Sequence, residues 1–313
     1  MVDVMNYAQT YSLFGQVNHM SPDDHYSDLK RVIAATTGKA KRINVIMPFM
    51  YESRQHKRTG RESLDCAMML QELHAMGVEN FITFDAHDPR VMNAIPQDSF
   101  DNISCSYQFI KAILSHVEDL DIDKNHMMII SPDEGGMSRA IYYANVLGID
   151  MGMFYKRRDY SKVVNGRNPI VAHEFLGADV EGKDVFIIDD MISSGESLID
   201  TAKELKERKA RRVFACCTFG LFTSGFNKFD QAYANGTLNG VFTTNLIYQQ
   251  PELLTKPWYI SVDMAKYIAL IIDNLNHDMS ISSILDSSQK INDKVAAYRA
   301  HREEMTQQME LPL

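Results

Sequence analysis

Two adjacent carboxylates, Asp189 and Asp190, follow an apolar run rich in β-branched residues within the stretch DVFIIDDMISSGESLID, residues 184–200. A turn of small and hydroxylated residues comes next, made of Ser193, Ser194, Gly195, Glu196 and Ser197. In a turn that leads into a helix, backbone N–H groups and hydroxyls can converge on a phosphate. The carboxylates can hold sugar hydroxyls or a Mg²⁺ ion. The alternative is an ordinary strand-end turn with a solvated acid pair and a serine cap.

Two further turns place acids and a histidine after apolar runs. SPDEGGMSRA, residues 131–140, has two glycines that allow close backbone approach before a helix, and its Asp133 can ligate a metal. FDAHDPR, residues 84–90, places His87 between two aspartates. Each turn taken alone also fits a structural role, with a capping acid in the first and a structural histidine in the second.

Basic side chains are concentrated in two segments of this acidic chain. YESRQHKRTGRES, residues 51–63, follows one apolar run, and YKRRDYSKVVNGR, residues 155–167, follows another. Their cations are Arg54, Lys57, Arg58 and Arg61 in the first and Lys156, Arg157, Arg158, Lys162 and Arg167 in the second. Two basic loops at one edge favour neutralisation of a polyphosphate, although a solvated loop explains any single cation.

The elements that must position these residues are alternating strands and helices. Strands are predicted at 42–49, 80–86, 126–133, 150–156, 184–190 and 212–219, with weaker candidates at 240–247 and 258–263. Amphipathic helical patterns lie between them, for example at residues 195–210. This pattern predicts an α/β fold with parallel sheets flanked by helices. In open α/β sheets, ligands bind beyond the carboxyl ends of the strands, where these turns lie.

The composition limits the class of protein. The chain has 313 residues, 45% of them hydrophobic and 23% charged, which is enough for two domains. A net charge of −9 argues against general nucleic-acid binding. No segment is apolar enough for a membrane span, and the first residues lack the pattern of a signal peptide. Four cysteines without CxxC spacing favour a reducing cytoplasm over a zinc site or a disulfide framework.

Several segments resemble one enzyme family. VFIIDDMISSGESL resembles the phosphoribosyl-pyrophosphate (PRPP) loop shared by type I phosphoribosyltransferases and ribose-phosphate diphosphokinases. MPFMYESRQHKR, FDAHDPRVMNAIP and IISPDEGGMSRA resemble the ATP loop, the Asp-Leu-His-Ala segment and the Ser-Pro-Asp-x-Gly-Gly turn of the second family. KRR, CTFGLFTSG and TTNLI resemble its later segments. Seven motifs in the family's order, over about residues 18–290, are more specific than any one of them.

This resemblance to the ribose-phosphate diphosphokinases implies a reaction and a set of roles. The enzymes transfer the pyrophosphoryl group of Mg-ATP to the C1 hydroxyl of ribose 5-phosphate, giving PRPP and AMP. The implied ATP contacts are Arg54, Gln55 and His87, the implied Mg²⁺ ligands are His87 and Asp133, and the implied catalytic residues are Lys156 and Arg158. The implied ribose 5-phosphate site consists of Asp189, Asp190, Ser193, Ser194, Gly195, Glu196 and Ser197.

The resemblance also implies an organisation. We expect two phosphoribosyltransferase-like (type I) domains, residues 1–120 and 121–286, and a polar C-terminal tail or helix at 287–313. We expect a cytoplasmic homo-oligomer, a hexamer or another assembly built from dimers, with no nucleic-acid or membrane partner.

Three departures from the family pattern leave alternatives open. The family has an N-terminal stretch with an adenine-contacting loop before the region that matches Val2–Met20, and MVDVMNY resembles the interior of a domain beginning with a strand. Glu196 stands where the family has glycine, which puts a negative charge near the expected phosphate. Phe219 replaces a histidine. A weak or inactive regulatory paralogue is therefore one alternative, and a phosphoribosyltransferase is a less favoured one.

Overall fold

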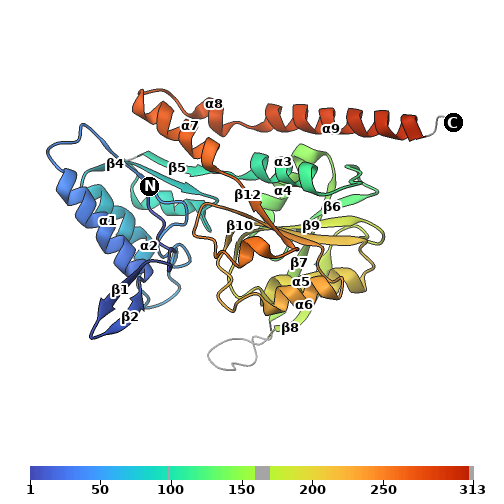
Figure 1. The fold of residues 1–313 in the computed structure, drawn as a ribbon, viewed down its shortest axis with the longest axis horizontal. Coiled ribbons are helices and arrows are strands. Elements are labelled where there is room, and N and C mark those ends of the chain that lie inside the picture. Colours follow the sequence, from blue (N-terminus) through green and yellow to red (C-terminus); the bar gives the residue numbers. More distant parts are fainter. Residues whose placement is uncertain (98, 159–169, 310–313) are drawn as a thin grey trace. The chain divides into compact units, whose positions relative to one another are not determined.

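A computed structural model describes residues 1–97, 99–158 and 170–309 of the chain (Figure 1). Side chains are described for these residues except 156–158, 170–173, 303 and 305–309. The strands are β1 (Thr10–Leu13), β2 (Gln16–His19), β3 (Ile43–Ile46), β4 (Val78–Phe84), β5 (Ser99–Ile103), β6 (Met127–Ser131), β7 (Asp150–Arg158), β8 (Ile170–Leu176), β9 (Asp184–Ile192), β10 (Arg212–Gly220), β11 (Gly240–Thr244) and β12 (Tyr259–Val262). The helices are α1 (Pro22–Thr36), α2 (Asp65–Ala75), α3 (Ser106–His116), α4 (Met137–Leu147), α5 (Glu196–Glu207), α6 (Asn227–Ala234), α7 (Ala265–Asn276), α8 (Ser282–Leu285) and α9 (Ser288–Met309), with 3-10 helices at Pro89–Ala94 and Leu253–Thr255.

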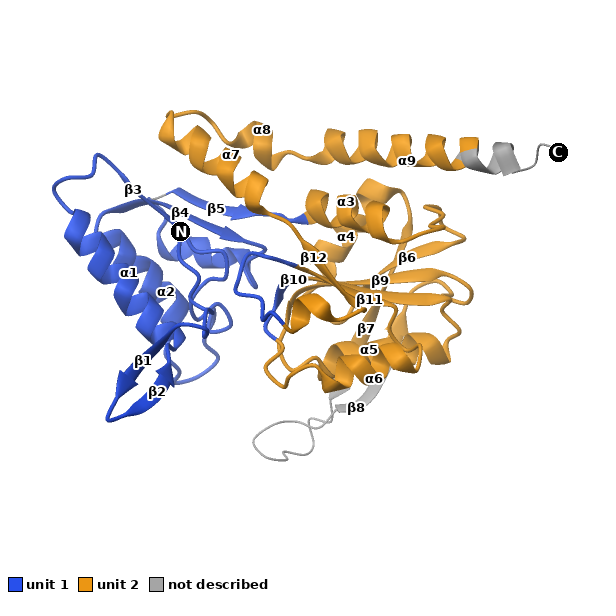
Figure 2. Cartoon of the chain, viewed as in Figure 1, with its two compact units in different colours: residues 1–105, 218–221, 244–251 blue, residues 106–217, 222–243, 252–313 orange. Residues whose placement is uncertain are grey.

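The chain forms two compact units that are interleaved in sequence. Unit 1 consists of residues 1–105, 218–221 and 244–251 (Figure 2). Unit 2 consists of residues 106–217, 222–243 and 252–313. Each unit therefore contains residues from both halves of the chain.

Unit 1 is built on a parallel sheet in the order β3-β4-β5. Helix α1 begins at a capping box, in which Ser21 Oγ accepts a hydrogen bond from Asp24 N and Asp24 Oδ2 accepts one from Ser21 N. Helix α2 buries Cys66, Met69, Leu70 and Leu73. The hairpin of β1 and β2 belongs to the same unit.

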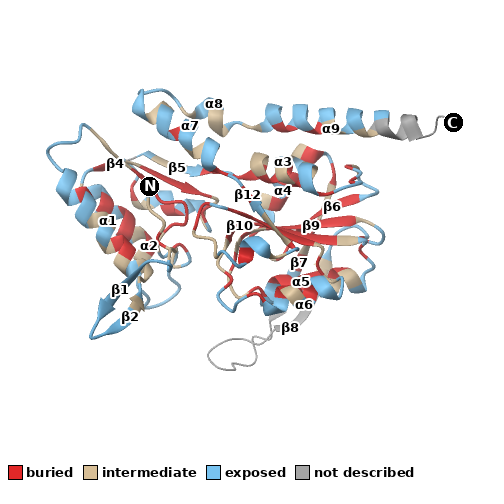
Figure 3. Cartoon of the chain, in the orientation of Figure 1, coloured by how far each residue is buried: buried red, intermediate tan, exposed pale blue. Residues whose placement is uncertain are grey.

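Unit 2 contains a sheet in the order β12-β11-β10-β9-β6-β7-β8, in which β8 pairs antiparallel with β7. Figure 2 shows α3 and α4 on one side of this sheet and α5 and α6 on the other. The central strands β6 and β9 are almost wholly buried (Figure 3), as expected for strands covered on both faces. They pair in parallel from Met127 with Asp184 to Ile130 with Ile187, so the turns that follow them share one edge of the sheet.

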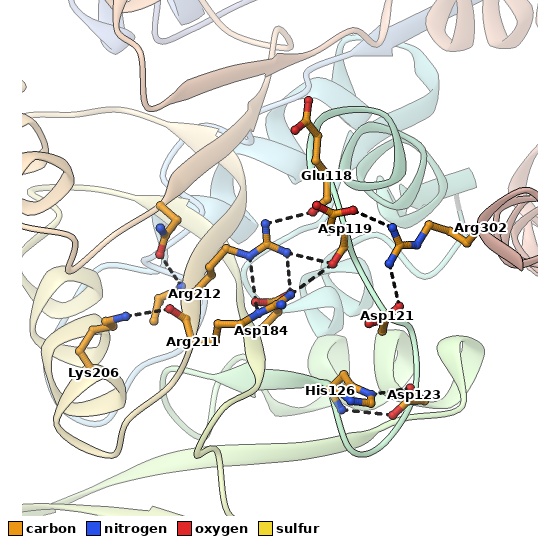
Figure 4. Close-up of polar contacts among 12 residues, drawn as sticks. Glu118, Asp119, Asp121, Asp123, His126, Asp184, Lys206, Arg211, Arg212 and Arg302 are labelled. Atoms are coloured by element: carbon orange, nitrogen blue, oxygen red, sulfur yellow. Dashed lines mark hydrogen bonds and ion pairs between the residues drawn. The ribbon is translucent and has the colours of Figure 1, made fainter. Parts of the chain in front are cut away.

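The first residue of β9, Asp184, forms ion pairs with two arginines (Figure 4). The side chain of Asp184 is fully buried and accepts hydrogen bonds from two arginines, with Nε–Oδ1 distances of 2.8 Å from Arg211 and 2.9 Å from Arg212. Both arginines also donate to backbone carbonyls, Arg212 to Glu118 and both to Asp119. This buried carboxylate has its hydrogen-bonding capacity met by the protein itself.

The α/β fold with parallel sheets agrees with the sequence prediction, and each of the eight predicted apolar runs overlaps a strand. The predicted strand at 184–190 ended with Asp189 and Asp190, whereas β9 continues two residues further, to Ile192. The strand expected in MVDVMNY is wrong: residues 1–9 form turns and irregular backbone, and Val2 N donates to Ile46 O without a continuing ladder. The short strands β1, β2, β5 and β8 were not predicted.

The polar C-terminal segment forms α9, which packs along α3 and α4. Ile291 and Val295 are buried, and Arg299 Nη2 donates to the carbonyls of Ile122 and Leu147. With so few buried apolar side chains, α9 has only a weak hydrophobic pattern. The sequence alone therefore could not distinguish a helix from a loose tail. In the described part of the chain, no helix is both long and apolar enough to cross a membrane.

Candidate functional site

The acid pair of unit 2 lies near the carboxyl end of β9. Asp190 is 5% exposed, and its backbone N–H donates to Asp189 Oδ1 at 2.8 Å. Burial raises the pKa of Asp189 well above its ordinary value, and the negative charge of neighbouring Asp190 raises it further. Two carboxylates held this close are stabilised by a cation or by hydroxyl groups that donate hydrogen bonds to them.

The turn after this pair leads directly into α5. Gly195 has a φ of +80°, and a Cβ on it would lie 2.3 Å from Phe229 Cζ, so both the backbone and the space require glycine. The first N–H groups of α5 have no acceptor one turn earlier, which makes the start of the helix suitable for an anion. Ser193 and Ser194 are half-buried, and Ser193 O accepts a hydrogen bond from Thr223 N at 3.0 Å.

Two side chains of this turn are exposed, Glu196 and Ser197. The Glu196 carboxylate forms an ion pair with the Lys228 ammonium group of α6. The structure thus gives the unexpected negative charge a partner within unit 2. Sequence reasoning missed Lys228, because nothing in the sequence brings residues 32 positions apart into contact.

The turn after β6 lies beside β9. Asp133 Oδ1 accepts hydrogen bonds from Gly135 N at 2.9 Å and from Gly136 N at 3.3 Å. A Cβ on Gly136 would lie 2.9 Å from Ser131 Oγ and 3.4 Å from Ile188 O, so this glycine allows the turn to approach β9. The structure therefore brings together the two turns of unit 2 that the sequence singled out.

Arg139 is a further residue of this site that sequence reasoning did not select. It lies in α4, is 16% exposed, and its Nη1 is 4.0 Å from Asp189 Oδ1. Its charge lowers the pKa of Asp189 and partly offsets the effects of burial and of Asp190. The signal was present, since Arg139 belongs to SPDEGGMSRA, but an arginine in an amphipathic helix is usually a surface residue.

In unit 1, the loop that follows β3 carries Arg54 and Gln55. Arg54 is exposed, whereas Gln55 is half-buried and its Nε2 donates to Ser63 O at 2.8 Å. The Gln55 backbone carbonyl accepts from Cys66 N at the start of α2. These bonds close the loop on itself and hold it against α2.

The same loop contacts the turn that follows β4. The rings of His56 and His87 lie 5.2 Å apart between centroids, and His56 Nε2 is 3.4 Å from Asp88 Oδ2. Hydrogen bonds from Arg90 lower the pKa of Asp88 to about 2. The structure therefore joins two of the sequence-predicted segments of unit 1, at His56 and His87.

Other candidates have structural roles or lie outside the described residues. Asp85 accepts hydrogen bonds from Cys105 N and from Thr218 Oγ1, at 3.3 and 2.6 Å. Phe219, which replaces a histidine of the family pattern, packs on Phe49 with 5.1 Å between ring centroids. The backbone of Lys156 and Arg158 belongs to β7, but their side chains lie outside the described residues. Within the described residues, no group of three or more His, Cys, Asp or Glu side chains can hold a metal ion.

Comparison with protein families assigns both parts of the chain. Residues 9–77 match the N-terminal domain of ribose phosphate pyrophosphokinase, and residues 96–250 match the phosphoribosyl transferase domain. The two matches follow each other in order and cover most of the chain. The chain belongs to the ribose-phosphate pyrophosphokinase family. The family resemblance inferred from the sequence is thereby confirmed.

Individual relatives of this pyrophosphokinase family member carry the same name. The ribose-phosphate pyrophosphokinase of Mycoplasma genitalium is 28% identical over 255 residues, which cover 81% of this chain and 73% of that protein. The ribose-phosphate pyrophosphokinase of Corynebacterium efficiens is 32% identical over 196 residues, or 62% of this chain and 57% of that protein. The crystal structure of phosphoribosylpyrophosphate synthetase from Mycobacterium smegmatis matches the fold with a TM-score of 0.71 at 21% identity, covering 86% of this chain and 90% of that one.

Proposed function

We propose that this protein transfers the pyrophosphoryl group of Mg-ATP to the C1 hydroxyl of ribose 5-phosphate, giving PRPP and AMP. The observation that carries the proposal is the acid pair of half-buried Asp189 and buried Asp190, followed by Gly195 and the start of α5. Sugar hydroxyls donate hydrogen bonds to carboxylates, and a phosphate accepts them from backbone N–H groups. A phosphorylated pentose therefore has hydroxyls that can bind the acid pair and a phosphate that can bind the turn at the start of α5. The family membership supports the same reaction.

The ribose 5-phosphate site in this proposal comprises the pair and the turn. Asp189 and Asp190 accept hydrogen bonds from the ribose hydroxyls. Residues 193–197 surround the 5-phosphate with N–H groups and hydroxyls. Arg139 holds Asp189 in position from α4. Such a transfer needs positioning and charge neutralisation rather than a protein nucleophile.

ATP binding is assigned to unit 1 and transition-state stabilisation to β7. We assign ATP contacts to Arg54, Gln55 and His87, which the sequence motifs predict. Lys156 and Arg158 are proposed to neutralise charge on the transferring group. Replacing Lys156 by alanine tests the second assignment, because an interaction made mainly in the transition state lowers kcat more than substrate affinity.

The donor chemistry of Asp133 fits a magnesium ion. Its Oδ1 accepts two backbone hydrogen bonds, and among the described residues no donor is bonded to its Oδ2. Magnesium is commonly bound by one or two carboxylates together with substrate phosphates and water. When bound, the ion neutralises charge on the ATP oxygens. His87 is the second proposed ligand, although imidazole is a less common donor to Mg²⁺ than carboxylate.

We also propose that the enzyme is a cytoplasmic homo-oligomer built from dimers, as the family resemblance implies. Light scattering coupled to size-exclusion chromatography measures its mass directly. A monomeric mass at assay concentrations would contradict this part of the proposal and leave the reaction untouched.

The deciding experiment supplies purified protein with ATP, Mg²⁺ and ribose 5-phosphate and follows AMP and PRPP. Both products should form in equal amounts and only when all three components are present. A folded sample that binds nucleotide but forms neither product would favour a regulatory paralogue. Consumption of PRPP with a nucleobase would favour a phosphoribosyltransferase.

A further inference from the structure

Glu196 occupies an unfavourable place for a site that receives phosphate. It is the first residue of α5 and follows Gly195, so its backbone belongs to the turn assigned to the 5-phosphate. A carboxylate there suits the positive end of the helix, but it repels a phosphate dianion bound at the same end. The binding site therefore needs a device that directs this charge elsewhere.

Lys228 supplies a partner for that charge. Its ammonium group is bonded to Glu196 Oε1, and both residues line a hollow of about 390 Å³ on the flank of α5 and α6. The side chains are 48% and 63% exposed for Lys228 and Glu196, respectively. An exposed ion pair contributes little to stability, so its value must be sought in the charge it places beside the turn.

The backbone that presents Lys228 is firmly held. The next residue, Phe229, is fully buried and covers Gly195, and its ring stacks on Trp258 at 5.2 Å between centroids. The following residue, Asp230, accepts a hydrogen bond from Trp258 Nε1 at 2.7 Å. Three consecutive residues of α6 therefore pair with Glu196, cover Gly195 and fix the helix. This arrangement distinguishes Lys228 from a lysine on a loose surface loop.

We infer that Lys228 is a positioning residue for the phosphate-binding turn, holding the Glu196 carboxylate toward α6 and offsetting its charge so that the turn can accept the 5-phosphate of ribose 5-phosphate. This inference rests on the proposed function for the identity of the ligand. Lys228 acts through Glu196 and does not touch the phosphate. The charges of the two side chains offset each other.

The test is a double-mutant cycle with Lys228→Met and Glu196→Gln, each of which removes a charge at nearly constant size. The dissociation constant for ribose 5-phosphate is measured by calorimetry without ATP, and KM and kcat are measured in the complete assay. Lys228→Met alone should raise Kd and KM about fivefold, roughly the size expected for one like-charge contact at a partly exposed site, with kcat within about twofold. Adding Glu196→Gln should restore both constants, and Lys228→Arg should keep them near the wild-type values.

Lys203→Met is the matched control. Lys203 lies in α5, lines the same hollow and pairs with Asp200 at 3.0 Å, with side-chain exposures of 57% and 62%. The Lys203→Met variant removes the same charge from the same region but leaves the ion pair of Glu196 and Lys228 intact, so Kd for ribose 5-phosphate should be unchanged. Raising the salt from about 0.1 M to about 1 M should shrink the effect of Lys228→Met, since the Debye length falls from about 10 Å to about 3 Å.

Three results would overturn the inference. An equal increase in Kd in Lys203→Met and Lys228→Met would mean that only the net charge of the region matters. If Lys228→Met still raises Kd when Glu196 is already replaced by glutamine, Lys228 must contact the phosphate directly. Folded wild-type protein that does not bind ribose 5-phosphate would remove the site altogether. Binding of ribose 5-phosphate without PRPP formation would contradict only the proposed reaction, because the calorimetric cycle would still report on Lys228.

Discussion

Strand β9 begins at a buried aspartate, Asp184, and carries half-buried Asp189 and buried Asp190 near its end. Burial alone would raise the pKa of Asp184, but hydrogen bonds from Arg212 and Arg211 lower it below its ordinary value. The pKa of Asp189 is raised instead, by burial and by the charge of Asp190. One strand thus holds a carboxylate whose pKa is lowered at one end and a carboxylate whose pKa is raised at the other.

This difference in pKa distinguishes a structural carboxylate, Asp184, from the carboxylates proposed to bind a ligand, Asp189 and Asp190. Two arginines that also bind the carbonyls of Glu118 and Asp119 join Asp184 to the loop before β6 (Figure 4). At the other end, Arg139 approaches Asp189 only to 4.0 Å. Carboxylates whose pKa is raised by burial and by a neighbouring like charge are typical of functional sites, whereas carboxylates that are paired with arginines stabilise the fold. Both kinds here lie within one strand.

The largest effect should come from Asp184→Asn. Removing this carboxylate leaves two arginines without their buried partner, so the free energy of unfolding should fall by about 3–5 kcal/mol. Because the pKa is lowered in the folded state, this stability is fully present above the unfolded pKa of about 3.9 and is lost as pH falls through the folded pKa. Urea unfolding at pH 7 and at pH 3 measures both values. A stability difference that does not shrink at pH 3 would contradict the assignment.

A second comparison uses glycines at the two ends of β9. Gly195 and Gly182 both have positive φ, +80° and +74°, but only Gly195 has a neighbour, Phe229, where a Cβ would be placed. Gly182→Ala should cost about 1 kcal/mol of backbone strain, and Gly195→Ala should cost about 2–4 kcal/mol because a steric clash is added. Thermal unfolding of the two variants measures the difference. Equal losses of stability in the two variants would mean that Phe229 does not pack against Gly195.

Asp190→Asn should act on function rather than on folding. Loss of one acceptor charge should raise KM for ribose 5-phosphate about tenfold, equivalent to about 1.4 kcal/mol, with no loss of stability. Asp200→Asn, on the exposed surface of α5, is the control and should leave KM unchanged. An unchanged KM in Asp190→Asn would remove this residue from the proposed site.

The smallest effect is expected from Asp189→Asn, which should stabilise the unliganded protein. Since the pKa of Asp189 is raised in the folded state, its contribution to stability is lost as pH rises through that pKa. The variant should therefore be more stable than wild type by about 0.5–1 kcal/mol at pH 8, with a smaller gain at pH 5. Melting temperatures at the two pH values check this. A destabilised variant at pH 8 would show that Asp189 is fully neutralised by the protein.

Much of this arrangement could be predicted from the sequence. The apolar runs of β6 and β9 are continuous because both faces are covered, and that pattern is visible without coordinates. The turns at Asp133 and Gly195 follow from glycines beside strand ends. The family follows from motifs in a fixed order. Local signals of this kind survive in the sequence because each is contained in a short stretch.

The partners of these residues could not be predicted. Asp184 finds Arg211 and Arg212 because β9 and β10 are neighbours in the sheet, and their pairing depends on the whole topology. Glu196 finds Lys228 only because Phe229 fixes α6 against the turn. The hairpin of β1 and β2 is mostly exposed, so no alternation of buried and exposed residues marks it. Charge partners and exposed strands depend on tertiary contacts that no short segment contains.

The interleaving of unit 1 has a consequence for the order of events during protein synthesis. Asp3 Oδ2 accepts a hydrogen bond from Tyr248 N at 2.6 Å, and Asp85 accepts one from Thr218, so residues near the start of the chain depend on partners made much later. At roughly 5–20 residues per second, a ribosome reaches Tyr248 roughly 7–30 s after Cys105. During most of that interval the nascent unit lacks Phe219, which packs on Phe49. Its sheet can begin to form early, but its closure must wait for translation of the segment 244–251.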